Sequence, residues 1–370
     1  MHSYSRSGCA GSEGRRGAVR TAVLASIALL AAPACLAHNS GDELLASTFS
    51  IVAIDPETGE LGIAVASKVL AVGHVVPWIE PGVGAIATQA LANPDYGSLG
   101  LDLLRDGLSP QDALDSLLSI DPGSDSRQVG VVSASGEVAA FTGSGTLAWS
   151  GHRMGEAFTC QGNILVGEEV LLAMEEAFLS AEGPLASRLL AALIAGDDAG
   201  GDSRGRQSAA LLVVRERGGY LGSTDRLVDL RVDDSEEPVT ELARLYDLWA
   251  PYFMLQAYLD SEGEAEQRYA FEILERALAR EGEDPQLLNA MAWYLAERGL
   301  EPGRALELAL RAHELAPEDA NIMDTVAQAF FSAGQFAEAV EWERRALEIE
   351  PGNSFFQEQL QRFLSTIGPQ

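Results

Sequence analysis

The C-terminal third of the chain contains an internal repeat, which constrains the fold more than any other feature of the sequence. Residues 292–317 align with residues 327–351, with one additional residue after Gly299, and the closing prolines Pro317 and Pro351 stand 34 positions apart. Each copy reads as two short helices, with a glycine after the first and a proline after the second. Repeats of this length bury their apolar faces only by stacking on neighbouring copies. An all-α solenoid is therefore predicted here.

The spacing and the placement of Gly, Ala and Pro resemble the tetratricopeptide repeat (TPR). A third, degenerate unit is expected over residues 242–284, since three stacked units are about the minimum that buries a continuous core. We therefore assign residues 241–370 to TPR-like helical repeats. The resemblance implies a concave groove that binds a protein partner. Residues 233–370 contain 10 Arg and 28 Asp or Glu, a net charge of −18, which favours a partner with a basic surface.

The first 37 residues have the composition of an export signal. Three arginines within residues 15–20 precede an apolar run over residues 21–37, which is too short for a typical membrane span of about 20 residues. We expect cleavage after Ala37, then a polar lead segment over residues 38–47. These features predict an exported protein, periplasmic or secreted, with no transmembrane span after removal of the signal.

A lipid anchor is the alternative outcome for this leader. The segment Ala32-Pro33-Ala34-Cys35 is a candidate lipoprotein site, in which Cys35 becomes the acylated N-terminus of an outer-membrane lipoprotein. The pair Arg15-Arg16 is a weaker indication of twin-arginine export.

Charge and cysteine content exclude several classes of protein. The chain has 25 Lys and Arg against 55 Asp and Glu, a net charge of −30, which argues against a nucleic-acid binder. Beyond the leader the one cysteine is Cys160, so a disulfide framework and a cysteine-based zinc site are both excluded. Its apolar, strand-like context predicts a buried structural residue. The five histidines form no metal motif and no nucleotide fingerprint is present, so no metal or cofactor is expected.

Residues 48–240 have the pattern of a layered α+β domain. Apolar residues occupy both faces of the first strands, which indicates a sheet covered on both sides. Ser109 and Pro110 have the residue types of an N-cap and first helical position. Two helices are expected over residues 167–179 and 184–194. The expected strands span 48–54, 61–66, 84–88, 128–133, 137–142, 156–161, 208–214 and 227–232.

Lys68 is the sharpest candidate for chemistry. Of the 25 basic residues, 24 are Arg, and the one Lys follows an apolar strand. A lysine amine can lose its proton when it is desolvated, whereas a guanidinium cannot, so Lys68 can serve as a base or activator. A single lysine left by chance is the alternative.

Two further segments have chemically suggestive compositions. Residues 200–208 combine glycines with Asp202, Arg204, Arg206 and Ser208, and guanidinium groups suit the recognition of a carboxylate. The alternative is an internal ion pair of Asp202 that fastens this loop. Residues 161–163, Gln-Gly-Asn, suit an oxyanion donor or, equally, a turn.

The region from residue 48 to about 248 resembles the domain-of-unknown-function 1028 family, which is grouped with the N-terminal nucleophile (Ntn) hydrolases. The matching segments are TFSIVA at 48–53, GELGIAVASK at 59–68, GAIATQA at 84–90, QGN at 161–163, GGDSRGRQSAA at 200–210 and DLRVDD at 229–234. This resemblance implies a four-layer αββα sandwich, in agreement with the doubly covered strands.

The resemblance also implies roles for individual residues. Thr48 would be the nucleophile and its free α-amine the base, which requires cleavage between Ser47 and Thr48. Lys68 would activate the Thr48 hydroxyl, with His74 as a weaker substitute. The remaining roles are oxyanion donors, Gln89, Asn93 or Asn163, and a substrate-binding loop formed by Asp202, Arg204, Arg206 and Ser208.

Two functions follow as expectations. The first is an exported amidohydrolase that acts on a small amide or peptide and binds a protein partner through its TPR region. The second is a non-catalytic Ntn-fold module that binds a ligand within an envelope protein assembly. For either function, a homo-oligomer is an open alternative to a monomer.

Overall fold

A computed structural model describes residues 48–147, 149–219, 222–253, 264–280 and 282–367. The expected signal over residues 1–37, with Cys35, and the lead segment over 38–47 lie outside these residues. Within the described ranges, no helix combines the length and apolar character that a membrane crossing requires.

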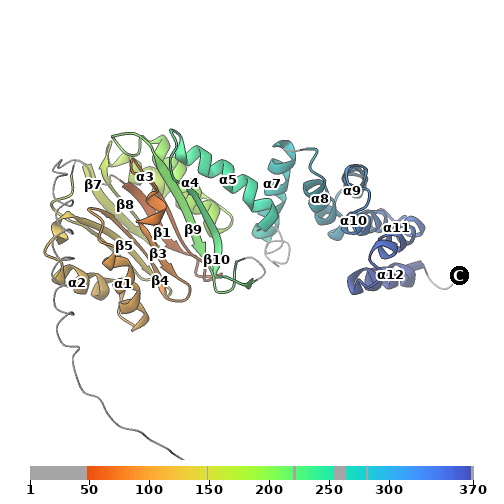
Figure 1. Cartoon of the computed structure of the whole chain (residues 1–370), viewed down its shortest axis with the longest axis horizontal. Helices are drawn as coiled ribbons and strands as arrows, with labels where there is room; N and C mark the ends of the chain where they lie inside the picture. Colours follow the sequence, from red (N-terminus) through yellow and green to blue (C-terminus); the bar gives the residue numbers. More distant parts are fainter. Residues whose placement is uncertain (1–47, 148, 220–221, 254–263, 281, 368–370) are drawn as a thin grey trace, which may run out of the picture. The chain divides into compact units, whose positions relative to one another are not determined.

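The first part of the described chain forms two antiparallel sheets stacked face to face (Figure 1). The larger sheet has the strand order β10-β9-β2-β1-β8-β7, and the smaller sheet has the order β3-β4-β5-β6. The strands are β1 (Thr48–Ile54), β2 (Leu61–Ser67), β3 (Pro77–Glu80), β4 (Gly84–Ala90), β5 (Arg127–Ser133), β6 (Val138–Thr142), β7 (Trp149–Gly155), β8 (Phe158–Leu165), β9 (Ser208–Val214) and β10 (Arg226–Val232).

Helices cover the outer face of each sheet. The helices α1 (Asp95–Arg105) and α2 (Pro110–Ile120) pack against the smaller sheet. On the larger sheet, α3 (Glu169–Ser180) and α4 (Leu185–Asp198) pack against β8, β1, β2 and β9 (Figure 1). The predicted four-layer αββα sandwich is confirmed.

The alternation of side chains along β1 explains why this strand is apolar on both faces. Phe49 and Ile51 pack with residues of α3 and α4, whereas Val52 and Ile54 pack between the two sheets. Because successive side chains of a strand point to opposite faces, a strand in the middle of a four-layer domain needs apolar residues at almost every position.

Three elements were missing from the sequence prediction, and each lacks the expected pattern. The strands β3 and β7 are edge strands whose side chains are mostly half-buried, so they have no continuous apolar run. Helix α1 follows Pro94, which provides no side-chain cap, and contains Gly97 and Gly100. These glycines lie against Trp78 and Ile86, where a Cβ atom would clash, so close packing sets their identity at the expense of helix propensity.

The C-terminal part of the described chain is a row of TPR-like helix pairs (Figure 1). Its helices are α7 (Glu264–Arg280), α8 (Pro285–Glu297), α9 (Pro302–Leu315), α10 (Ala320–Ser332), α11 (Phe336–Ile349) and α12 (Ser354–Ile367). Asp284 and Asp319 cap α8 and α10 at equivalent positions of the two copies. Gly299 and Gly334 follow these helices with φ of 64° and 75°, a conformation that favours glycine.

Helix α5 (Pro238–Phe253) connects the two regions in sequence. It packs against β9 and β10 of the larger sheet, so the expected boundary between residues 240 and 241 falls inside a single helix. The apolar residues Val239 and Leu242 are buried at its start, so α5 begins as part of the core of the first region.

Candidate functional site

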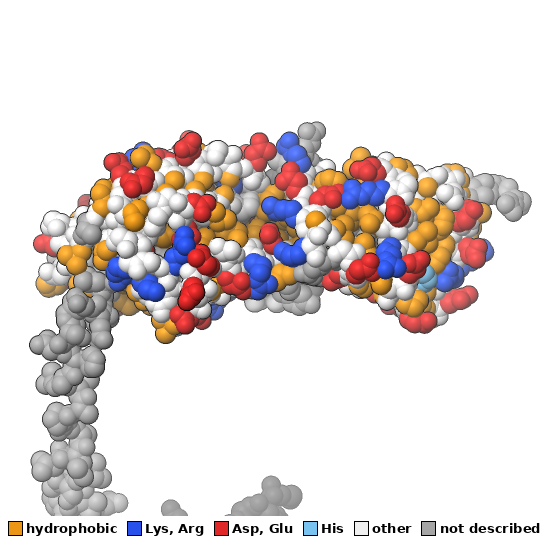
Figure 2. All heavy atoms as spheres, turned by 90° about the horizontal axis from the view of Figure 1, so that it is seen from above, with side chains coloured by type: hydrophobic (Ala, Val, Ile, Leu, Met, Phe, Trp, Pro, Cys, Tyr) orange, Lys and Arg blue, Asp and Glu red, His pale blue; other side chains and the backbone are white. Residues whose placement is uncertain are grey.

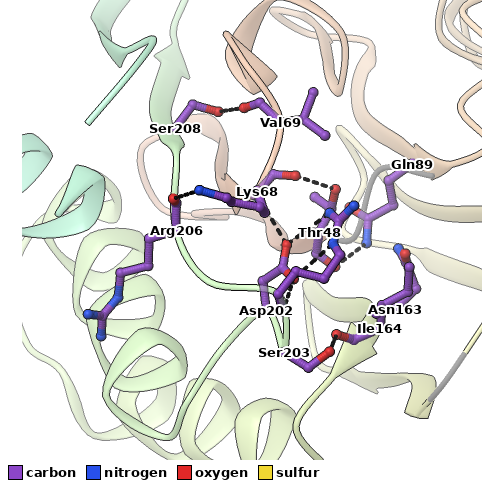
Figure 3. A network of polar contacts seen from close by, with 12 residues as sticks. Thr48, Lys68, Val69, Gln89, Asn163, Ile164, Asp202, Ser203, Arg206 and Ser208 are labelled. Carbon is purple, nitrogen blue, oxygen red and sulfur yellow. Dashed lines mark hydrogen bonds and ion pairs between the residues drawn. The ribbon is translucent and has the colours of Figure 1, made fainter. Parts of the chain in front are cut away.

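Thr48 begins β1 at the polar end of the space between the two sheets. It pairs with Ser67 of β2 and with Asn163 of β8 in the register of the larger sheet, and it is completely buried. The Thr48 hydroxyl donates to Ser67 Oγ at 3.2 Å, and the Thr48 carbonyl accepts from Gln89 Nε2 at 3.3 Å (Figure 3). Two strands of the larger sheet and one strand of the smaller sheet therefore fix the position of Thr48.

Three buried glutamines fill the space next to Thr48 and join the sheets. Gln89 of β4 donates to Gln128 Oε1 of β5 at 2.9 Å and accepts from Ser50 Oγ at 2.7 Å. Gln161 of β8 donates to the same Ser50 hydroxyl at 2.6 Å. A buried amide is stable only when its groups are paired, and these amides satisfy one another across the two sheets.

The oxyanion donors suggested by the family resemblance take part in this network. The Gln89 amide nitrogen donates to the Thr48 and Gln161 carbonyls as well as to Gln128. Asn163 Nδ2 donates to Gln128 Oε1 at 2.9 Å. These donors therefore link the two sheets beside Thr48.

Asn93 lies outside the network of Figure 3. Its Oδ1 accepts from the Asp95 backbone amide at 3.1 Å, at the start of α1, and its carbonyl accepts from the Thr88 hydroxyl. His74 lies in the short 3₁₀ turn over residues 72–74. The structure thus brings Thr48, Gln89 and Asn163 together and gives Asn93 a role in a turn.

Gly130 of β5 makes room for the Gln161 side chain. A Cβ atom at position 130 would lie 2.1 Å from Gln161 Oε1, and hydrogen bonds to Ser50 and Thr159 hold that amide in place. We expect Gly130→Ala to lower the free energy of unfolding by about 1–3 kcal/mol, because the pinned amide cannot move aside. Urea denaturation measures this loss.

A double-mutant cycle tests the physical cause of that loss. In a Gln161→Ala background, Gly130→Ala is expected to have little further effect, because the clashing atoms are gone. An equal loss in both backgrounds would contradict the steric explanation.

Lys68 fixes the loop that follows α4. Its backbone amide donates to Asp202 Oδ2 at 2.8 Å, and its ammonium group donates to the Arg206 carbonyl at 2.9 Å (Figure 3). Because β2 ends at Ser67, whose side chain faces the inter-sheet space, the Lys68 side chain leaves the sheet and is exposed. The hydrogen bond of the ammonium group therefore joins two segments that are distant in sequence.

The Asp202 carboxylate is almost completely buried and organises this loop. Besides the Lys68 amide, it accepts from the Arg204 amide at 2.9 Å and pairs with the Arg204 guanidinium at 3.1 Å. The internal ion pair that was the alternative for this segment is thus present. Figure 3 shows the Asp202 side chain beside Thr48.

We expect Asp202→Asn to lower the free energy of unfolding by about 2–3 kcal/mol, because hydrogen bonds to a buried carboxylate are lost or weakened. Chemical denaturation of the full chain measures this change. The matched control is Asp198→Asn, at an exposed position at the end of α4, for which a change within about 0.5 kcal/mol is expected. Equal effects of the two substitutions would contradict the assigned role.

Arg206 and Ser208 also have defined partners. Arg206 donates to Asp197 at 2.8 Å and to Glu237 at 3.0 Å, and the hydrogen bond to Asp197 raises the pKa of Arg206. Burial raises the pKa of Asp197, and the Arg206 guanidinium opposes that shift. The buried Ser208 hydroxyl accepts from the Val72 amide and donates to the Val69 carbonyl (Figure 3).

Ser50, Ser67 and Gln128 are the site residues that sequence reasoning missed. Each occupies a buried position among the apolar residues of its strand. A polar residue at such positions in several strands was the available signal, since buried polar groups must find partners. Cys160, in contrast, is buried among apolar side chains as predicted, and burial raises the pKa of its thiol.

Charged side chains on the surface are interspersed. On the face shown in Figure 2, Arg side chains lie among Asp and Glu side chains. Arg304 pairs with Glu275 at 2.6 Å, and Arg311 pairs with Glu314 at 2.8 Å. Among the described residues, no group of three or more His, Cys, Asp or Glu side chains could hold a metal ion.

Known proteins resemble the two regions separately. A crystal structure of a DUF1028 protein from Silicibacter pomeroyi is 37% identical, with a TM-score of 0.51, and the match covers 55% of this chain and 89% of that chain. A TPR repeat-containing protein of Pseudomonas aeruginosa is 38% identical over 74 residues, which are 20% of this chain and 12% of that protein. The second TPR domain of human RPAP3, solved with an HSP70 peptide, is 18% identical, with a TM-score of 0.28 and coverage of 32% of this chain and 96% of that one.

The model of the family of unknown function DUF1028 matches residues 48–242. This range begins at Thr48, the first residue of β1, and ends in α5, which packs on the larger sheet. It therefore includes both sheets, the glutamine network and the loop around Asp202. The match extends over more than half of the chain, which belongs to the DUF1028 family.

Proposed function

We propose that the DUF1028 domain hydrolyses an amide bond in a small amide or peptide, with the hydroxyl of Thr48 as the nucleophile. The observation that carries this proposal is the position of Thr48. It begins a central strand, its hydroxyl contacts Ser67 Oγ at 3.2 Å, and fixed polar groups from both sheets surround it. A nucleophile needs such a fixed environment.

The proposed chemistry requires an N-terminal Thr48. Cleavage of the bond between Ser47 and Thr48 would free the α-amine of Thr48, which then takes the hydroxyl proton while the hydroxyl oxygen attacks the substrate carbonyl carbon. The amine returns the proton to the leaving nitrogen as the amide bond breaks. Water then hydrolyses the resulting ester and regenerates the hydroxyl. We further propose that the chain is exported before it acts.

The chain combines a DUF1028 domain with a TPR-like helical region, and this combination supports a role as a protein-interaction module. We propose that its groove recruits a protein partner to the enzyme. The net charge of −18 over residues 233–370 favours a partner with a basic surface.

A second candidate function is ligand binding without turnover. The hydrogen bonds that engage the Lys68 ammonium group, the Gln89 amide and the two guanidinium groups of the loop favour it. In this candidate function, the polar residues around Thr48 only stabilise the fold, and the bond between Ser47 and Thr48 is not cleaved.

Covalent labelling tests the proposed nucleophile. The full chain, recovered after expression with its own leader, would be treated with a peptide β-lactone and its peptides mapped by mass spectrometry. We expect one acyl group on the hydroxyl of a Thr48 that is the first residue of its peptide. Thr48→Ala should remain unlabelled, and Thr224→Ala, at an exposed loop position, should be labelled like the unmodified protein. Equal labelling of Thr48→Ala would overturn the proposal.

A further inference from the structure

Two carboxyl groups lie buried together in the last repeats. Asp324 of α10 is 4% exposed and Glu343 of α11 is 0% exposed. Asp324 Oδ1 and both carboxylate oxygens of Glu343 receive no hydrogen bond from the described residues. Two unprotonated carboxylates without donors in such a place would be strongly unfavourable.

The repeat register shows how unusual Glu343 is. Counting back the 34-residue period places Glu343 at the position of Ala309, a fully buried residue of α9. The preceding copy thus has a methyl group where this copy has a carboxyl group. The acid at this position is a property of one repeat, and the packing of a helix pair does not require it.

One cation and one further acid face the pair from the neighbouring helices. The charge of Arg362 of α12 lowers the pKa of Asp324, and the charge of Glu297 of α8 raises it. Arg362 donates to Gln328 Oε1, and its guanidinium lies 5.2 and 5.1 Å from the ring centroids of Phe331 and Phe363. Its charge acts against the effect of burial and is the weaker influence on both carboxyl groups.

A proton shared between Asp324 and Glu343 would give these buried carboxyl groups the hydrogen bond that they lack. A hydrogen bond between Asp324 and Glu343 forms only if one of the two carboxyl groups is protonated. We propose that Asp324 and Glu343 are a proton-binding pair that couples the folding of α10–α12 to pH, so that this end of the helical region loosens as the pH rises. This inference is independent of the proposed hydrolase activity.

Proton linkage determines whether the stability of these helices rises or falls with pH. Burial raises the pKa of Asp324, and burial together with the neighbouring Asp324 charge raises the pKa of Glu343. The folded repeats therefore hold a proton that the unfolded chain has released. Stability is highest below the ordinary carboxyl pKa range and is lost as the pH rises through the raised values.

His313 also titrates in these helices, but in a different pH range from the carboxyl pair. The His313 ring packs edge-on against Trp342 with centroids 4.7 Å apart, and burial lowers the pKa of His313. His313 is therefore neutral above its ordinary pKa of about 6.5, and a comparison between about pH 6.5 and about pH 9 reports mainly on the carboxyl pair.

Hydrogen exchange of the full chain tests the proposal, with mass spectrometry reading peptides from α10–α12 and from β1–β2 separately. Protection factors, corrected for the intrinsic effect of pH, are expected to fall at least about tenfold in α10–α12 from pH 6.5 to pH 9, since one proton contributes up to tenfold per pH unit. Glu343→Gln should remove most of this dependence, because a neutral amide takes the place of the protonated acid.

Glu341→Gln is the matched control, at an exposed position of the same helix, and should retain the pH dependence of the unmodified chain. If Glu343→Gln unfolds the repeats, Asp324→Asn provides the same test from α10. Protection in α10–α12 of the unmodified chain that does not change with pH would overturn the proposal. So would an unchanged pH dependence in a folded Glu343→Gln or Asp324→Asn variant.

Discussion

Gln128→Leu is expected to lower the free energy of unfolding of the DUF1028 domain by about 3–5 kcal/mol. Gln128 Oε1 accepts from Gln89 and Asn163, and Gln128 Nε2 donates to the Gly162 carbonyl at 2.8 Å. Leucine has a similar size, so the substitution removes hydrogen bonds rather than volume. The remaining amides and carbonyl would stay buried without this partner, and each such group is destabilising by about 1–3 kcal/mol.

Urea denaturation of the full chain, followed by a signal from the DUF1028 domain, measures the loss. Gln111→Leu is a suitable control, because Gln111 is exposed on α2 and bonds to Asp115 one turn away. The control should change stability by no more than about 0.5 kcal/mol. A Gln128→Leu variant as stable as the unmodified protein would show that the glutamine network does not hold the two sheets together.

Thr48→Ala is expected to reduce amide hydrolysis by at least about a thousandfold, because it removes the proposed nucleophile. Thr48→Ser retains a hydroxyl group and should keep part of the activity. Both variants should keep the αββα fold, since the adjoining strand partners Ser67 and Asn163 are unchanged. Turnover of a library of short peptides and acyl-amino acids, with circular dichroism as the check on folding, measures the effect.

Retention of full turnover by Thr48→Ala would contradict the proposed nucleophile and leave any observed hydrolysis to another group. Lack of turnover in the unmodified chain, with saturable binding of one of the same compounds, would instead favour the ligand-binding candidate.

The architecture could be predicted because its signals are local. The 34-residue period requires stacked helix pairs, and apolar residues on both faces of β1 and β2 require a sheet covered on both sides. The edge strands β3 and β7 carry no such signal, because one edge of each lacks a neighbouring strand and their side chains are only partly buried.

The site was predictable in part. The resemblance identified Thr48, Gln89 and Asn163, which the structure places together, but no local pattern indicates that Gln128 of β5 joins two of them across the sheets. The composition singled out Lys68 as the one lysine, yet the direction of its ammonium group depends on where β2 ends and on the Arg206 carbonyl, 138 positions away. Pairing of this kind is set by tertiary structure.

The central claim is that Thr48 becomes the N-terminal residue of the active chain. The most direct test is the intact mass and N-terminal sequence of the protein recovered from a bacterium that expresses the chain with its own leader. The proposed mechanism predicts a chain that begins at Thr48. A chain that begins at His38, or at an acylated Cys35, with Thr48 still inside it would contradict the mechanism.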